Sequence, residues 1–95
     1  MKLYWRNGMR PDIAMCIIAR DELDTIKNYT HLMEEVDCPQ CKHVIEDIIF
    51  EELAHIGEAM ENLKRINPEW YSKIEEGKLE VRDIAHDVPE FLRGE

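Results

Sequence analysis

The sequence has no long apolar segment. Its longest uncharged apolar run extends from Ile13 to Ala19 and is seven residues long, whereas a helix needs about 20 apolar residues to cross a bilayer. The first residues, Met1 to Arg6, also lack the continuous apolar stretch of a secretory signal. We therefore expect no membrane helix and a cytoplasmic protein.

The sequence also has few positively charged residues and few cysteines. Twelve Lys and Arg face twenty-one Asp and Glu, and the resulting net charge of -9 repels phosphate backbones and attracts cations. The three cysteines are an odd number, and a chain without a secretory signal is usually kept reduced. These features argue against nucleic acid as a partner and against a framework of disulfides.

Glycine and proline are scarce, with four of each, and most of them fall between the periodic segments. No segment shows the two-residue alternation of a strand, whereas apolar residues recur at the three- and four-residue steps of amphipathic helices. The sequence therefore predicts an all-α chain that forms a single domain over residues 1–95. The expected elements are long helices at about 12–36 and 39–66, a short helix at about 68–76 that ends at Gly77, and a short C-terminal helical segment within 79–95.

Only a few residues around Asp37 separate the two long helices, so these helices should pack as antiparallel neighbours. One apolar face of each helix then stays open, because the C-terminal third is too short to cover both. A chain of 95 residues also buries only a small core on its own. We therefore expect a homodimer in which two hairpins complete a four-helix bundle.

A carboxylate and an imidazole lie one turn apart on the second long helix. Glu52 and His55 are three residues apart, so their side chains project from one face, which is otherwise apolar. Glu22 has a similar place on the first helix, and a buried carboxylate needs a partner. Glu22 and Glu52 each lie 15 residues from Asp37, which is about 22 Å at the helical rise per residue. The three side chains should therefore meet at one height.

This combination is half of a known metal-binding set. Di-iron four-helix proteins use one Glu from each of two helices and a Glu-x-x-His pair from each of the other two. A two-fold dimer would supply two copies of Glu22, Glu52 and His55, whose four carboxylates balance two divalent ions. The residues therefore predict a two-metal site between two chains, although the ligand types leave iron, manganese and zinc open.

A wider pattern extends over about residues 15–75. Its residues are Asp21-Glu22-Leu23-Asp24, Tyr29, Glu51-Glu52-Leu53-Ala54-His55, Leu63-Lys64-Arg65 and Asn67-Pro68-Glu69-Trp70. Together with the interval between Glu22 and Glu52, this pattern resembles the encapsulated ferritins. Members of that family are ferritin-like two-helix chains that assemble as decameric rings of dimers, oxidise Fe(II) at a di-iron site on the dimer interface, and reside inside encapsulin shells.

The resemblance implies a ferritin-like fold, ferroxidase activity, a decamer and a place within an encapsulin nanocompartment. Three residues match the family's iron ligands: Glu22, Glu52 and His55. Tyr29 matches a tyrosine beside the site, and Asp21 and Asp24 stand where the family has glutamates linked to ion entry and secondary metal binding. The chain departs from the family at Asn28, where characterised members have tryptophan, and at residues 88–95, which match the hydrophobic tag of encapsulin cargo poorly.

Cys38 and Cys41 permit a second interpretation. With His43 following, they stand at the start of the second long helix, where the helix dipole can lower the pKa of a thiol. A single C-x-x-C pair is incomplete for zinc, so a redox or metal role competes with two ordinary turn cysteines. The alternative function is a non-catalytic acidic helical module that binds a metal or a partner through this pair. A third hypothesis is a metal-stabilised oligomer that stores ions without turnover.

Overall fold

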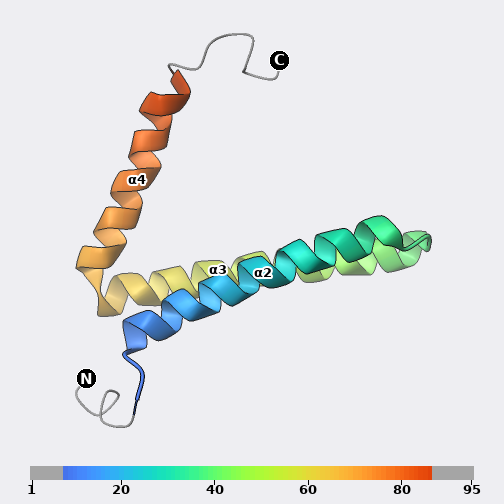
Figure 1. Cartoon of the computed structure of the whole chain (residues 1–95), viewed down its shortest axis with the longest axis horizontal. Helices are drawn as coiled ribbons and strands as arrows, with labels where there is room; N and C mark the ends of the chain where they lie inside the picture. The colour runs from blue at the N-terminus through green and yellow to red at the C-terminus, as the bar shows by residue number, and fades with distance from the viewer. Residues whose placement is uncertain (1–7, 87–95) are drawn as a thin grey trace.

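The chain forms three helices over residues 8–86, which are the residues that the computed structural model describes (Figure 1). They are α2 (Pro11–Glu35), α3 (Pro39–Ile66) and α4 (Pro68–His86). This part of the chain contains no strand, which confirms its all-α prediction, and none of its helices is long and apolar enough to cross a membrane. Residues 87–95, with the poor match to a cargo tag, lie outside the described residues.

Proline and asparagine define the helix boundaries. Pro11 and Pro39 occupy the first turn of α2 and α3, where a missing N–H costs nothing. Asn67 ends α3 by donating its N–H to the Leu63 carbonyl at 2.8 Å, and its side-chain oxygen accepts the Trp70 N–H at 3.1 Å, which caps α4. The helix α2 lies one residue earlier than the predicted 12–36, and α3 spans the predicted 39–66.

The prediction that the third helix ends at Gly77 is wrong. The helix α4 continues through Gly77 to His86, so the short helix at 68–76 and the start of the C-terminal segment are one element. Gly77 does not have the positive φ that a terminating glycine adopts. An ion pair between Lys78 and Glu75 at 2.8 Å joins the turns on its two sides, which favours continuation.

Replacing Gly77 with alanine is expected to stabilise the chain by about 0.5–1 kcal/mol, because alanine loses less backbone entropy than glycine in a helix. A Cβ added at Gly77 meets no atom within 4 Å, so no clash opposes the gain. Thermal unfolding followed by circular dichroism would measure it. Gly8→Ala is the control and should give no gain, because Gly8 has a φ of 149°. A loss of helicity in Gly77→Ala would contradict the continuous α4.

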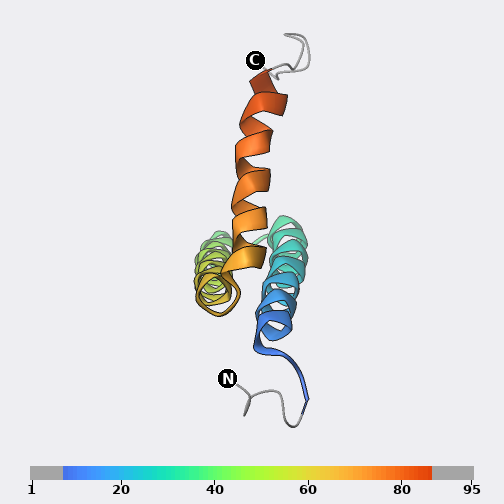
Figure 2. The ribbon, with the colours of Figure 1, turned by 90° about the vertical axis from the view of Figure 1, so that its left-hand side faces the viewer.

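The helices α2 and α3 lie side by side and antiparallel, and α4 projects away from the open end of this hairpin (Figures 1 and 2). The described chain measures 49 × 39 × 15 Å, so it is a single layer of helices. Its radius of gyration is 17.9 Å, whereas a compact domain of this length has about 12 Å. The chain therefore has an open shape that exposes both faces of the hairpin.

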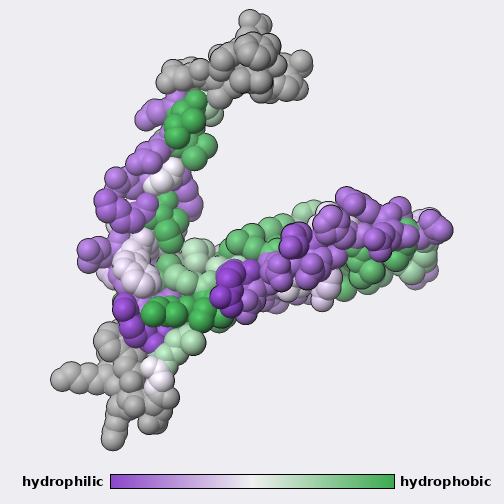
Figure 3. All heavy atoms as spheres, viewed as in Figure 1, coloured by the Kyte–Doolittle hydropathy of each residue, from purple (hydrophilic) through white to green (hydrophobic). Residues whose placement is uncertain are grey.

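The core of this layer is small. Leu63 is fully buried and Ala59 nearly so, both near the end of α3. Figure 3 shows apolar surface along the hairpin and along α4. Large apolar side chains that remain exposed on the hairpin include Ile18, Leu23, Leu32, Val44, Phe50 and Leu53, and those on α4 include Trp70, Ile74, Leu79, Val81 and Ile84. A single chain thus leaves much of its apolar surface in water, which is unfavourable.

A buried carboxylate ties α2 to the corner between α3 and α4. Asp12 is 5% exposed, and its Oδ2 accepts hydrogen bonds from Arg10 at 2.7 Å and from the Asn67 side chain at 2.8 Å. Its Oδ1 accepts the Ile13 N–H at 2.8 Å, and the Arg10 guanidinium lies over the Trp70 ring. Because Asn67 also caps α4, this network connects the starts of α2 and α4.

Acid is expected to weaken this corner. The hydrogen bond from Arg10, more than any other contact, lowers the pKa of Asp12 from its ordinary value of 3.8, with burial opposing and Asn67 and Ile13 assisting. A carboxyl whose pKa is lower in the folded state contributes stability above its unfolded pKa and loses it as the pH falls through the folded pKa. The melting temperature should therefore fall more steeply below about pH 4 in the wild type than in Asp12→Asn. Asp47→Asn, at an exposed position of α3, should leave the slope unchanged.

Candidate metal centre

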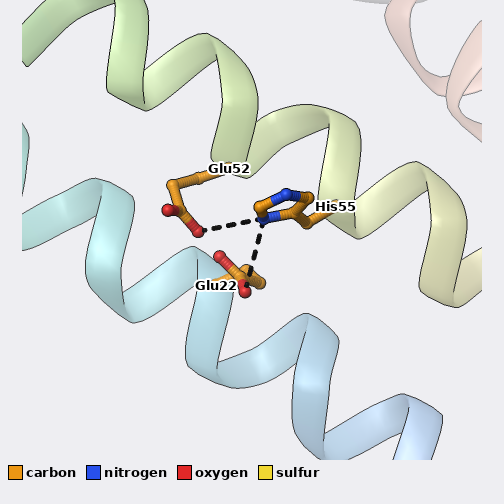
Figure 4. Close-up of side chains that lie close together, drawn as sticks. All are labelled: Glu22, Glu52 and His55. Carbon is orange, nitrogen blue, oxygen red and sulfur yellow. Dashed lines mark ion pairs between the residues drawn. The ribbon is translucent and has the colours of Figure 1, made fainter.

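Three potential metal ligands converge from the two helices of the hairpin. Glu22 comes from α2, and Glu52 and His55 come from α3 (Figure 4). One ligand atom from each lies within 4.8 Å of the others. His55 Nδ1 is 3.5 Å from a Glu52 carboxylate oxygen and 3.8 Å from a Glu22 carboxylate oxygen. The structure therefore brings together the three side chains that the spacing predicted to meet.

Local helix geometry explains this meeting. Glu52 and His55 stand three residues apart in an unbroken helix, so they share a face. Glu22 reaches the same height because the two helices run antiparallel from a short connection and have the same rise per residue. No change of loop or backbone is needed to align them.

Burial differs among the three side chains in a way that bears on ligand binding. The Glu22 and Glu52 side chains are 22% and 19% exposed, whereas His55 is 48% exposed. The second oxygen of Glu22, Oε2, is buried and has no hydrogen-bond partner. Such an atom costs about 1–3 kcal/mol when it stays unpaired. The two carboxylates are thus largely shielded from water, and protein contacts do not replace all of the hydrogen bonds that water would make to them.

The donor set fits a divalent cation. Two carboxylates and an imidazole are ligands that iron, manganese and zinc accept. A cation would neutralise the two nearby carboxylates and give the unpaired Glu22 oxygen a partner. Glu22, Glu52 and His55 would hold it, and three donors leave coordination positions free for water or for side chains from another chain.

Tyr29 is not one of the three converging side chains. It is half-buried on α2, seven residues closer to the connection than Glu22, which corresponds to about 10 Å along the helix axis. Seven residues are about two helical turns, so Tyr29 and Glu22 lie on the same side of α2.

Asp21 and Asp24 also lie outside the cluster. Around the axis of α2, Asp21 stands about 100° and Asp24 about 200° from Glu22. Both residues are exposed. Asp21 pairs with Arg20 at 3.0 Å and Asp24 pairs with Lys27 at 3.5 Å. Within one chain each of these carboxylates is already balanced by a neighbouring cation.

The cysteine pair forms no comparable centre. Cys38 and Cys41 are free and exposed at the start of α3. Among residues 8–86, the Glu22, Glu52 and His55 cluster is the one group of three or more metal-ligating side chains that converges, so His43 does not complete a site with the two thiols.

Comparison with known proteins identifies a distant relative. No model of a protein family matches the chain, and no solved structure matches it. The chain is 29% identical over 84 residues to the ferritin-like–encapsulin shell fusion protein of Pyrococcus furiosus. The match covers 88% of this chain and 24% of that protein, so the chain spans about a quarter of its relative's length. The three potential metal ligands therefore occur in a chain that is distantly related to a ferritin-like fusion protein.

Proposed function

We propose that this chain is a ferroxidase that oxidises Fe(II) to Fe(III) at a di-iron site formed between two chains. Each chain contributes Glu22, Glu52 and His55, and two hairpins form a ferritin-like four-helix bundle around the site. The product iron passes to storage. The observation that carries the proposal is the convergence of these three donors, with one buried carboxylate oxygen left unpaired.

The shape of the single chain supports the pairing of two hairpins. Three donors are too few to surround two metal ions, and the hairpin exposes large apolar side chains beside them. A second hairpin would bury that surface and add three more donors at the same height. Four carboxylates would then balance the charge of two Fe(II) ions, which removes the repulsion between neighbouring carboxylates.

The geometry of the cluster supports a role for each of its three side chains. Glu22 and Glu52 would hold the iron with their carboxylates, and His55 would bind through one ring nitrogen from the more exposed side. Each bound Fe(II) gives up one electron to dioxygen or peroxide. Tyr29, two turns from Glu22 on the same side of α2, would act beside the site. Asp21 and Asp24 would serve as surface sites for incoming cations after exchanging their present partners.

The assembly and location rest on the similarities rather than on the geometry. The distant relative is a fusion of a ferritin-like part with an encapsulin shell, and this chain spans about a quarter of its length. We propose that the chain likewise acts with an encapsulin shell, as a decameric ring in a nanocompartment of the cytoplasm. Co-expression with a candidate shell protein would test this association.

Loss of one ligand is expected to reduce aerobic Fe(II) oxidation to the protein-free rate. A change in a group that only orients a metal ligand costs about 10- to 100-fold, so Glu52→Gln and His55→Ala, which remove a ligand, should cost at least as much. Formation of Fe(III) followed by absorbance would measure the rate. Glu51→Gln is the matched control, because Glu51 is an exposed neighbour on α3 and should keep the wild-type rate. Wild-type rates in both ligand variants would exclude this site.

The same residues also suit a storage site without turnover. In that case Glu52→Gln would reduce the number of bound Fe(II) ions in the absence of oxygen, but the wild-type protein would not oxidise iron faster than buffer does. If the cysteine module were the true function, metal binding would survive Glu52→Gln and disappear after alkylation of the thiols. Parallel binding and oxidation assays therefore separate the three functions.

A further inference from the structure

The turn between α2 and α3 carries two cysteines whose side chains interact. Cys38 caps α3, and its sulfur accepts the backbone N–H of Cys41 at 3.1 Å. Pro39, at the first helical position, has no N–H to offer. The first backbone N–H groups that this sulfur can accept are therefore those of the residues after Pro39. Both thiols are free and exposed, and a dissolved molecule can reach them at the end of the hairpin.

The two thiols differ in proton affinity. Hydrogen bonds from the Cys41 thiol and from the backbone N–H groups of Cys41 and Gln40 lower the pKa of Cys38. The pKa of Cys41 is raised, chiefly because its thiol proton is bound to Cys38. The positive end of the α3 dipole adds to the stabilisation of a thiolate at Cys38. One cysteine is thus prepared to attack, while the other retains its proton.

The spacing of the pair also suits a bond between them. Residues three apart at the start of a helix have neighbouring side chains, and the Cys38 sulfur already lies 3.1 Å from the backbone nitrogen of Cys41. Two thiols are too few to bind zinc tightly, and no third ligand among residues 8–86 joins them. The pair is therefore better suited to two-electron thiol chemistry than to metal binding.

We propose that Cys38 and Cys41 form a thiol–disulfide exchange site for small disulfides at the end of the hairpin. The Cys38 thiolate attacks one sulfur of the disulfide, which forms a mixed disulfide and releases the first small thiolate. Cys41 then loses its proton and attacks the Cys38 sulfur, which forms the Cys38–Cys41 disulfide and releases the second. Two protein thiols are oxidised, one small disulfide is reduced to two thiols, and the two protons of the pair pass to the products.

This site is separate from the metal centre. Cys38 lies 14 residues before Glu52, which is about 21 Å along α3. The proposal thus stands whether or not the chain oxidises iron, and metal-free protein can test it. The remaining cysteine, Cys16, lies within α2 and is also exposed. Cys16→Ser is therefore the background for all measurements.

The test treats full-length, metal-free Cys16→Ser protein with oxidised glutathione and follows the mass of the intact chain. The expected product has lost two hydrogen atoms, carries no glutathione and contains no free thiol. Adding Cys41→Ser should stop the reaction at one bound glutathione, because the second attack is impossible. Adding Cys38→Ser instead should slow the first attack several-fold, because Cys41 holds its proton more tightly.

Two results would overturn the proposal. One is a wild-type pair that accumulates two bound glutathiones instead of an internal disulfide. The other is equal alkylation rates at Cys38 and Cys41 in folded Cys16→Ser protein, measured by peptide mass, because the rate advantage of Cys38 depends on the cap of α3. Unfolding in urea should remove that advantage, and circular dichroism would verify that each variant folds.

Discussion

Fe(II) added in the absence of oxygen is expected to give assemblies with an even number of chains and one iron ion per chain. Each chain supplies two carboxylates and one imidazole, so two chains are needed to surround two ions with four carboxylates. At free Fe(II) about 100 times the dissociation constant, binding should add about 2.7 kcal/mol of stability. Native mass spectrometry would count chains and ions together, and thermal unfolding would report the gain.

Glu22→Gln is the variant that tests the shared metal site most directly. The substitution retains the size of the side chain but removes its charge. The assembly should therefore lose iron, and added Fe(II) should no longer increase its stability. Glu34→Gln, at an exposed position of the same helix, should behave as the wild type does. A single chain that ignored added iron, or a Glu22→Gln protein that bound one ion per chain, would contradict the shared site.

Leu63→Ala is expected to cost about 2–5 kcal/mol, because it leaves a cavity where a leucine was fully enclosed. Leu63 has no exposed surface and is the largest fully buried side chain of residues 8–86. A small domain has only about 5–15 kcal/mol of stability in total, so this one change should remove a large part of it. Urea unfolding of the metal-free chain would measure the loss from the shift of the midpoint.

Leu53→Ala provides the comparison, because it removes the same atoms from the same helix at a position that is 46% exposed. Its cost should be about 1 kcal/mol, since less apolar surface returns to water and no closed cavity forms. Equal losses in the two variants would show that Leu53 is buried as deeply as Leu63, which would point to a second chain covering it even without metal.

The helical hairpin could be predicted because the residue patterns that specify it lie close together in the sequence. Apolar residues at helical spacing indicated α2 and α3, and the prolines at positions 11 and 39 marked their starts. The meeting of Glu22 with Glu52 and His55 followed from the constant rise of a helix and from equal distances to the turn. Gly77 shows the limit of local reasoning, because glycine can either end a helix or be tolerated within it, and the predicted end at this residue was wrong.

Contacts between residues far apart in the chain determine features that the spacing of apolar residues does not predict. Asp12 is polar and lies in the first turn of α2, so nothing local indicated that it would be buried against Asn67, which is 55 residues away in the chain. The direction of α4 and the burial of one Glu22 oxygen likewise depend on which elements touch. A side chain's place around its own helix is set by a repeat of 3.6 residues, so it can be predicted from the sequence. The contacts between helices depend on distant residues that pack together only in the folded chain.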